Sequence, residues 1–422
     1  MAGTAGRVRV RAPWFILAVG APLALGACVP SRPPPPPAPM RLPEAAVLVP
    51  AAPEAVGLAA GLPARLDSIA RAAVADRAAS AVAVSAGRWG RLVHQRGYGA
   101  TDWAPGAPPA GDSTIFDLAS LTKVVATTTA AMILEEEGRL QLDRPVAYYV
   151  PELTDTLKAG ITVRQILTHR GGFEAFAPLY QNTRGQAEYL RKINERPLKH
   201  APGTETVYSD WDLILMQRVI EHISGQTLDQ FADARIFRPL GMHDTGFRPA
   251  AALRPRIAAT EVDRSRGGLI QGEVHDPNAW AIGGVAGHAG LFSSARDLAV
   301  FAQMLLNNGE YGGVRILRPE TVARWTAPQF AGSSRALGWD TPSGRSSAGR
   351  FFGPRSYGHT GYTGTSLWID PERGVFVVIL TNRVNPTAEN QKHVPLRRTV
   401  ADAVMEAVLD APLTNWEARR GG

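Results

Sequence analysis

Apolar side chains recur with the two-residue period of strands near both ends of a long segment, residues 56–412. Ala81–Ser85 and Leu92–Tyr98 predict two strands around a turn at Gly87–Gly90. Near the other end, Ser366–Ile369 and Val375–Thr381 are strongly β-prone. Residues 370–374 supply the turn between them because they hold Asp, Pro and Gly.

Helical patterns occupy most of the sequence between these strand pairs and also flank them. Five segments predict helices: Leu62–Val74, Ser120–Glu137, Val163–His169, Asp297–Leu306 and Thr399–Leu409. Glycines stop several of them, as Gly138 does after Glu137. Residues 140–355 are mostly helices separated by Pro and Gly loops, and no second linker or repeat interrupts residues 56–412.

This order of elements predicts an α+β fold. The simplest packing returns the last two strands to the first two as one antiparallel sheet. The first and last helices then cover the sheet, and residues from about 140 to 355 form a helical lobe. A cleft between the two lobes is the expected place for a site.

The N-terminus carries the pattern of an export signal. Basic residues precede an apolar run, Trp14–Ala27, which at 14 residues is too short to span a bilayer comfortably. The run ends in Leu-Gly-Ala-Cys, which resembles a bacterial lipobox. We therefore expect residues 1–27 to be a lipoprotein signal peptide and Cys28 to become the acylated first residue. A plain signal or an uncleaved anchor is the alternative.

Proline dominates the residues that follow. Pro33–Pro37 lies inside a Pro- and Ala-rich stretch, and proline lacks the backbone donor that helices and sheets need. We expect residues 28–55 to be an extended tether, residues 56–412 to be the catalytic domain and residues 413–422 to be a tail. The protein is then exported and membrane-anchored, facing the periplasm or the outer surface.

Composition narrows the function classes. The net charge of +7 is small and scattered, and no basic run with interleaved aromatic residues predicts a nucleic-acid surface. Cys28 is the single cysteine, so neither an intrachain disulfide nor a Cys-based zinc site can form. Only five of the 45 basic residues are Lys, which gives each lysine more weight as a candidate for chemistry.

Ser120-Leu121-Thr122-Lys123 is an S-x-x-K motif. On a helix, residues i and i+3 share a face, so the hydroxyl and the amine can meet. A serine hydroxyl needs a base to become a nucleophile, and lysine can serve where arginine cannot. Taken alone, the motif occurs by chance about once in five such chains. Ser120 is then a helix cap and Lys123 a solvated side chain.

Two further motifs accompany it. Tyr208-Ser209-Asp210 follows in the chain, and His359-Thr360-Gly361 precedes the last strand pair. In order and spacing the three motifs resemble those of class C β-lactamases, low-molecular-mass penicillin-binding proteins and related esterases. The resemblance extends over nearly all of residues 56–412. It implies a β-lactamase/transpeptidase-like fold and a serine hydrolase that needs no cofactor.

The resemblance implies roles for these residues. Ser120 is acylated, and Lys123 takes its proton, alone or with Tyr208. Tyr208 protonates the leaving group, and the backbone N–H groups of Ser120 and Tyr362 form the oxyanion hole. Asp210, His359, Thr360 and Gly361 line the substrate site.

Two positions depart from the family pattern. Asp210 stands where β-lactamases usually carry Asn, and an ionised carboxylate cannot donate a hydrogen bond to a substrate. It could instead pair with Lys123 and hold its charge. His359 stands where Lys is usual, and a neutral His attracts a substrate carboxylate less than a fixed cation does. Both changes argue against an efficient β-lactamase.

Residues 272–290 look most like a branch of D-alanyl-D-alanine carboxypeptidases. Alignment of the Gly-Leu-Phe-Ser stretch predicts that His288 and Ala289 lie beside the nucleophile. His275, Asp276 and His288 also suit a metal, but the family mechanism needs none. We expect a hydrogen-bonded loop that lines the groove, without metal.

The sequence therefore predicts a lipid-anchored serine hydrolase, most similar to D-alanyl-D-alanine carboxypeptidases. Its substrate is a peptidoglycan peptide or a small acyl compound, and no obligate protein partner is evident. A β-lactamase or a broad esterase is the alternative on the same machinery. A non-catalytic penicillin sensor or wall-binding lipoprotein is the alternative from another class.

Overall fold

The strands expected from the sequence form the centre of a six-stranded sheet, in the order β1-β3-β2-β13-β12-β11. The structure is a computed structural model and describes residues 47–420. β2 (Ala81–Arg88) pairs antiparallel with β3 (Arg91–Gly99) and with β13 (Val375–Thr381). β12 (Ser366–Asp370) and β11 (Tyr357–Thr360) continue the sheet. The last strands thus return to the first two, and the predicted α+β fold is confirmed.

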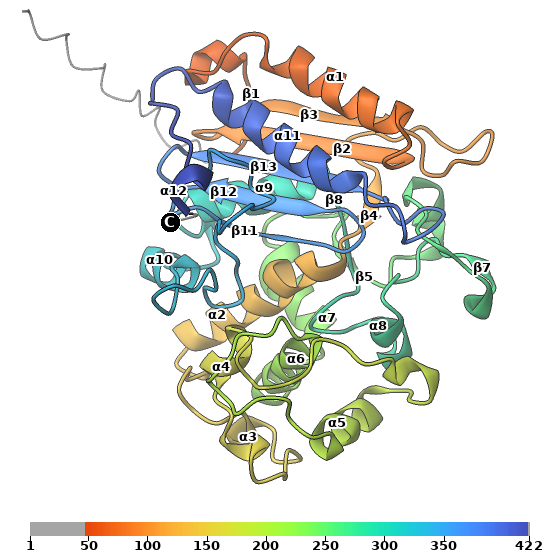
Figure 1. The fold of residues 1–422 in the computed structure, drawn as a ribbon, viewed down its shortest axis with the longest axis vertical. Coiled ribbons are helices and arrows are strands. Elements are labelled where there is room, and N and C mark those ends of the chain that lie inside the picture. Colours follow the sequence, from red (N-terminus) through yellow and green to blue (C-terminus); the bar gives the residue numbers. More distant parts are fainter. Residues whose placement is uncertain (1–46, 421–422) are drawn as a thin grey trace, which may run out of the picture. The chain divides into compact units, whose positions relative to one another are not determined.

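Alternate residues of β13 point to opposite faces of the sheet, and both faces are covered. Val377 and Ile379 pack in one core with α1 (Leu62–Ala75) and α11 (His393–Glu406), which lie side by side over this face (Figure 1). Phe376 and Val378 belong to the other core, where α9 (Ala295–Leu306) covers the sheet. Burial on both faces explains why β13 reads as an unbroken apolar run.

The second lobe is mostly helical (Figure 1). Its centre is α6 (Asp210–Ser224), a largely buried helix that packs against α2, α3 and α4. The other helices are α2 (Thr129–Glu136), α3 (Val146–Tyr149), α4 (Val163–Leu167), α5 (Gln186–Glu195), α7 (Leu228–Ala232), α8 (Pro277–Ile282), α10 (Pro319–Thr326) and α12 (Glu417–Arg420). α9 falls inside the span expected for the helical lobe but packs on the sheet instead.

A small three-stranded sheet connects the two lobes. β8 (Leu291–Ser294) pairs with β4 (Ile115–Asp117) on one side and with β5 (Gly246–Phe247) on the other. Two strand pairs stand apart from both sheets: β6 (Val262–Asp263) with β7 (Gly268–Leu269), and β9 (Glu310–Tyr311) with β10 (Val314–Arg315). Because β4 ends three residues before Ser120, this small sheet sets the position of the S-x-x-K segment.

The folded domain begins before residue 56, so the last part of the expected tether belongs to it. β1 (Val49–Pro50) pairs parallel with β3, and residues 53–56 form a 3₁₀ turn. The N–H of Val49 donates to Gly90 O at 3.3 Å, and that of Ala51 donates to Leu92 O at 3.0 Å. Pro50 is tolerated because an edge strand has one side free of hydrogen bonds. The signal peptide, Cys28 and the earlier tether lie outside the described residues.

Two helical segments differ most from their expected bounds, whereas α1, α4 and α9 differ by one or two residues at one end. α11 begins at His393, six residues before the expected Thr399, and ends at Glu406. Pro395 is compatible with this start because the first N–H groups of a helix have no intrahelical acceptor. The run expected as one helix from Ser120 to Glu137 begins as a 3₁₀ turn and continues as a π-helix, Lys123–Thr128, before α2. Within residues 47–420, no helix combines the length and apolar character needed to cross a membrane.

Candidate active site

Ser120 lies in a tight turn between β4 and the helical run. The carboxylate of Asp117 accepts the N–H of Ala119 at 2.8 Å. Ala119 has a φ of 46°, a left-handed conformation that a residue with a Cβ adopts at a cost. The Thr122 hydroxyl donates to Ala119 O at 2.6 Å and closes the turn. These bonds hold Ser120 at the edge of a cavity.

Lys123 is fully buried, and each of its three N–H groups has an acceptor. Its Nζ donates to Ser120 Oγ at 2.9 Å, to Asp210 Oδ1 at 2.8 Å and to the backbone oxygen of His288 at 3.1 Å. Burial acts to lower the Lys123 pKa, but Asp210 and Tyr208 raise it more, so the pKa lies above its ordinary value. Lys123 is therefore an ammonium at neutral pH, and Asp210 is its counter-charge.

Tyr208 completes the group around Lys123. Lys123 Nζ lies 4.8 Å from the centre of the Tyr208 ring. The rings of His169 and His359 are 4.6 and 5.8 Å away, and the guanidinium of Arg335 is 5.3 Å away. The phenol ring thus lies among two cationic side chains, Lys123 and Arg335, and two histidine rings.

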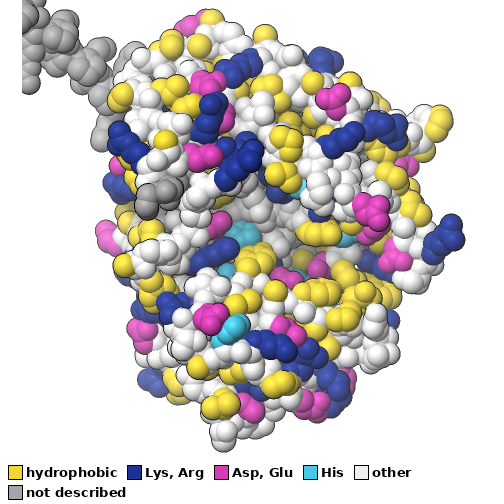
Figure 2. Space-filling model, in the orientation of Figure 1, with side chains coloured by type: hydrophobic (Ala, Val, Ile, Leu, Met, Phe, Trp, Pro, Cys, Tyr) yellow, Lys and Arg dark blue, Asp and Glu magenta, His cyan; other side chains and the backbone are white. Residues whose placement is uncertain are grey.

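A cavity of about 370 Å³ opens beside Ser120. Figure 2 shows the molecule hollowed where the helical lobe meets the sheet lobe. The cavity lining combines the motif residues with cationic and polar side chains: Ser120, Tyr208, Arg335, Asp340, His359, Thr360, Gly361, Tyr362, Arg383, Gln391, His393 and Arg397. The structure therefore brings all three sequence motifs to one place.

The turn after β11 approaches the nucleophile closely. A Cβ on Gly361 would lie 2.2 Å from Leu118 O and 2.1 Å from Thr365 Oγ1, so only glycine fits. Thr365 Oγ1 donates to Leu118 O at 2.9 Å and fixes this contact. The next N–H, that of Tyr362, has no hydrogen-bond acceptor within residues 47–420. It is thus available to an oxyanion formed at Ser120.

Arginines supply the positive charge of the cavity lining, whereas His359 is neutral. Burial and the charges of Lys123 and Arg335 lower the pKa of His359 to about 3, and its Nδ1–H donates to Thr360 O at 2.8 Å. Burial and the neighbouring Arg383 lower the pKa of Arg397 to about 9, which leaves it charged at neutral pH. Arg335, Arg383 and Arg397 therefore give this wall its positive charge.

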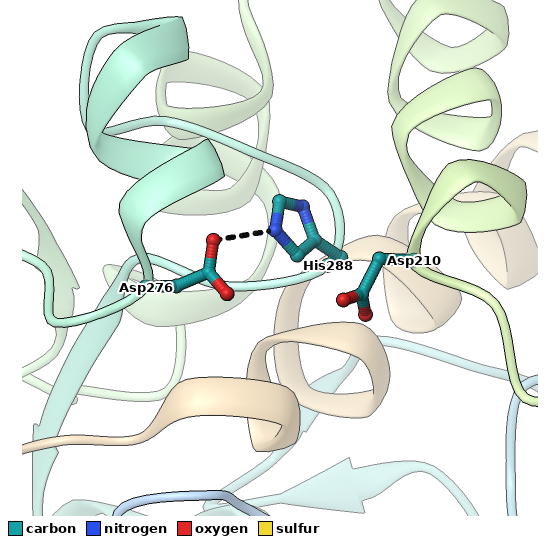
Figure 3. Close-up of side chains that lie close together, drawn as sticks. All are labelled: Asp210, Asp276 and His288. Atoms are coloured by element: carbon teal, nitrogen blue, oxygen red, sulfur yellow. Dashed lines mark hydrogen bonds and ion pairs between the residues drawn. The ribbon is translucent and has the colours of Figure 1, made fainter. Parts of the chain in front are cut away.

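Asp276 and His288 form a second polar pair beside Lys123. His288 Nε2 lies 2.9 Å from Asp276 Oδ1, and Figure 3 shows both side chains near Asp210. Burial acts to raise the pKa of Asp276, but His288 and the other hydrogen bonds lower it to about 2. Ligand atoms of the three side chains lie within 4.8 Å of one another, as a metal site would require. Each carboxylate already has a hydrogen-bonded partner, Lys123 for Asp210 and His288 for Asp276.

His275 and Ala289 do not join this cluster. His275 Nε2 lies 2.9 Å from Glu261 Oε2, and its ring stacks on that of Tyr362 at 5.8 Å. His288 contacts Lys123 through its backbone oxygen, and Ala289, the next residue, is buried. The loop of residues 272–290 is thus held by hydrogen bonds, and one of its carbonyls holds Lys123.

Comparison with known proteins identifies the family. The model of the family described as "Beta-lactamase" matches residues 66–402. The chain belongs to the β-lactamase family. A protein of Escherichia coli (strain K12) named "Putative D-alanyl-D-alanine carboxypeptidase" is 36% identical over 343 residues, which cover 72% of this chain and 78% of the relative. The resemblance seen in the motifs is thereby confirmed, and the chain is a serine hydrolase of this family.

Solved structures share the fold. A class C β-lactamase from Rhodobacter sphaeroides matches with a TM-score of 0.63 at 19% identity, over 80% of this chain and 97% of its own. The octameric penicillin-binding protein homologue from Pyrococcus abyssi matches with a TM-score of 0.64 at 21% identity, over 84% of this chain and 80% of its own. These matches confirm the β-lactamase/transpeptidase-like fold.

Sequence reasoning missed several residues of this β-lactamase-family site. Arg335, Arg383 and Arg397 line the cavity, but arginine is so frequent in this chain that no pattern marks them. His169 and Asp212 lie behind Tyr208 as a buried pair. His169 lies within the span of the family resemblance, but nothing in the sequence pairs it with Asp212.

Proposed function

We propose that this serine hydrolase is a D-alanyl-D-alanine carboxypeptidase that acts on cell-wall peptides through an acyl-enzyme at Ser120. The proposal depends chiefly on the three arginines, Arg335, Arg383 and Arg397, that line the cavity beside the nucleophile. A carboxypeptidase substrate carries a free carboxylate next to the scissile amide, and arginine binds carboxylates through charge-assisted hydrogen bonds. The name of the Escherichia coli relative supports the same substrate class.

The protonation of Lys123 selects the base. An ammonium cannot accept the proton of Ser120, so in this proposal the phenolate of Tyr208 accepts it while Lys123 stabilises that phenolate. Ser120 Oγ then bonds to the carbonyl carbon, and the N–H groups of Ser120 and Tyr362 bind the oxyanion.

The remaining steps return the enzyme to its starting state. The carbon–nitrogen bond breaks, and Tyr208 gives its proton to the leaving amine of the terminal D-alanine. A water molecule next transfers a proton to Tyr208 and attacks the acyl carbon. The carbon–oxygen bond to Ser120 then breaks, and Ser120 regains the proton.

The proposed substrate class is tested by changing the C-terminal carboxylate of the peptide. A short peptide ending in D-Ala-D-Ala is compared with the same peptide carrying a C-terminal amide. We expect kcat/KM to be about tenfold or more higher for the free acid, since hydrogen bonds to charged groups contribute that much. Arg335→Gln should reduce this preference mainly through KM. Arg345→Gln is the matched control because Arg345 is exposed and outside the cavity lining.

Two further substrates separate this proposal from the alternatives. A chromogenic cephalosporin tests β-lactamase activity, and a short-chain nitrophenyl ester tests esterase activity. Rapid turnover of the cephalosporin or the ester, with no release of D-alanine from the peptide, contradicts the peptidase proposal.

Acylation by a labelled penicillin tests the nucleophile independently of the natural substrate. We expect Ser120→Ala to abolish labelling, because Ser120 is the serine of the cavity lining and its hydroxyl accepts a hydrogen bond from Lys123. Ser113→Ala serves as the control and should label like the wild type. Stoichiometric labelling of Ser120→Ala contradicts the assignment.

A further inference from the structure

His169 holds the segment of Tyr208 at three points. Its backbone oxygen accepts the N–H of Val207 at 2.9 Å, and its Nδ1 accepts the N–H of Ser209 at 3.2 Å. Between these two bonds, the His169 ring lies 4.6 Å from the ring of Tyr208. One residue therefore binds both neighbours of the tyrosine and also contacts its side chain.

The two hydrogen bonds from Val207 N and Ser209 N to His169 are called the backbone bracket. The backbone of His169 has the conformation that this bracket requires. Its φ is 55°, in the left-handed region that few residues with a Cβ adopt. The residue follows α4, and its own N–H donates to Ile166 O at 3.2 Å. Carbonyl and side chain are thereby both directed toward residues 207–209.

Asp212 orients the His169 ring from the first turn of α6. Its Oδ2 lies 3.2 Å from His169 Nδ1, and both side chains are at most 2% exposed. Its other oxygen has no hydrogen-bond partner among the described residues, and its ion-pair contact there is with His169. A Cβ on Gly171 would lie 2.3 Å from Asp212 Oδ1, so this glycine makes room for the carboxyl.

The hydrogen bonds determine where the proton lies. The Ser209 N–H points at His169 Nδ1, so that nitrogen carries a lone pair and no proton. A second lone pair on Asp212 Oδ2, 3.2 Å away, would repel it. The contact is attractive when Asp212 is protonated and donates to Nδ1, whose lone pair is then shared with the Ser209 N–H. The His169 proton is then on Nε2, which has no hydrogen-bond partner among the described residues.

We propose that His169 and Asp212 form a neutral hydrogen-bonded pair, with the proton on Asp212, which positions Tyr208 for proton transfer. His169 and Asp212 are positioning residues because they act through the tyrosine. The proposal relies on Tyr208 as the proton acceptor and not on the identity of the peptide substrate.

The surroundings agree with a neutral pair. Burial raises the pKa of Asp212, Asp210 adds to this effect, and Lys123 opposes it. Burial lowers the pKa of His169, as do the charges of Arg335, Lys123 and His359. Ionised Asp212 would put a second carboxylate charge beside Asp210 and would disfavour a phenolate at Tyr208.

Isosteric variants test the pair through single-turnover acylation by a fluorescent penicillin. Asp212→Asn keeps a neutral donor to Nδ1, so we expect its acylation rate constant to stay within about threefold of the wild type. Asp212→Ala should lower that constant roughly 10- to 100-fold with little change in penicillin affinity, because the tyrosine is misplaced. A loss in Asp212→Asn as large as in Asp212→Ala contradicts a protonated Asp212.

Two variants at His169 separate the backbone bracket from the ring contact. Asn tolerates the left-handed conformation and can accept the Ser209 N–H, so His169→Asn keeps the bracket without the ring. We expect its acylation rate constant to lie between those of the wild type and His169→Ala. Equal rate constants for wild type and His169→Ala contradict the positioning role.

Asp297→Ala is the matched control for a general loss of stability. Asp297 is also buried, and it accepts hydrogen bonds from Asp244 N and Thr245 Oγ1, away from the cavity lining. We expect this variant to melt at a lower temperature but to acylate at the wild-type rate. A rate loss matching that of Asp212→Ala would assign the effect to stability.

Melting temperature against pH tests the protonation of Asp212 without any substrate. A carboxyl whose pKa is raised on folding contributes stability that is lost as pH rises through its folded-state pKa. As pH rises above the ordinary range of an Asp carboxyl and toward the raised folded-state pKa, the wild type should lose stability relative to Asp212→Asn. A constant difference between the two contradicts the protonated form, whatever the enzyme hydrolyses.

Discussion

Asp210, which stands where the family usually carries Asn, holds Lys123 in its charged form. Asp210 Oδ1 lies 2.8 Å from Lys123 Nζ, and the Lys123 side chain is fully buried. Replacing one partner of such a pair leaves a buried charge without compensation. Asp210 is therefore the departure from the family pattern that gives Lys123 its counter-charge.

Asp210→Asn should change the pH dependence of acylation. Without the carboxylate, burial dominates and the pKa of Lys123 falls, so the ammonium is lost at a lower pH. If the ammonium supports the Tyr208 phenolate, the alkaline limb of the acylation profile should move down by more than about one pH unit. Asp233→Asn, an exposed carboxylate paired with Arg238, should leave the limb in place. An unmoved limb in Asp210→Asn contradicts this role of Lys123.

Among single residues, those that belong to a catalytic motif could be predicted from the sequence. The side chains that surround the motif residues in the folded protein could not. Ser120, Lys123 and Tyr208 belong to motifs, and the structure brings them together at one cavity. Arg397 reaches the site through long-range packing, and Asp212, although four residues after Tyr208, finds its partner His169 43 residues away in the chain. A buried carboxyl or a buried arginine has no local signature, because its environment is made by residues far away in the chain.

The turn between β11 and β12 carries the N–H of Tyr362 that we propose for the oxyanion, and an arginine on α11 supports this turn. Arg397, on α11, donates from Nη2 to Gly361 O at 2.6 Å and to Thr365 O at 2.8 Å. The guanidinium thereby fixes the turn from behind, while Thr365 and Gly361 fix it against Leu118. This turn thus depends on a strand pair, a helix and the segment before the nucleophile.

Gly361→Ala should disrupt this turn. The added Cβ would meet backbone and hydroxyl atoms at 2.1–2.2 Å, and neither neighbour is the far end of a flexible side chain. We expect the free energy of unfolding to fall by about 2 kcal/mol, a usual cost of overpacking, and acylation to be nearly lost. Gly160→Ala is the control because a Cβ there meets nothing within 4 Å. If Gly361→Ala were acylated at the wild-type rate, this turn would not be needed to form the oxyanion hole, and the prediction would be wrong.

Helices and strands with a strong apolar pattern could be predicted, but irregular helix starts between them could not. β13 matches its expected bounds because its apolar run is unbroken, and the start of α1 matches because a proline follows Leu62. The π-helix after Ser120 and the early start of α11 were missed. Both depend on packing against other elements, which alters helix geometry without changing the local pattern.

At the scale of the whole molecule, the cavity is formed by both lobes and by segments from most of the chain. Ser120 follows β4, Tyr208 precedes α6, and Tyr362 follows β11. The two lobes are tied together near Ser120 because Leu291 N donates to Thr122 Oγ1 at 3.0 Å and Leu118 N donates to Leu291 O at 2.9 Å. We therefore expect the site to be lost in any fragment that contains one lobe alone.

We also propose that the enzyme is exported and held at the membrane by a lipid on Cys28. The basic start, the apolar run and the Leu-Gly-Ala-Cys sequence support this proposal, and so does a substrate found in the cell wall. Because β1 begins at Val49, residues 28–48 remain for the tether, and fully extended they would reach about 65 Å at the polyproline rise per residue. Because Cys28 is the only cysteine, the test of this proposal involves a single thiol.

Cys28→Ser should abolish incorporation of a radioactive fatty acid and release the protein from the membrane fraction. The physical reason is that several acyl chains together anchor a protein stably, whereas the mutant has no thiol to accept them. Deletion of Pro33–Pro37 is the control, since it shortens the tether but leaves the acceptor intact and should preserve labelling. Penicillin acylation at Ser120 should persist in both variants, because the catalytic domain is unchanged. A Cys28→Ser protein that still takes up the label contradicts lipidation at this residue.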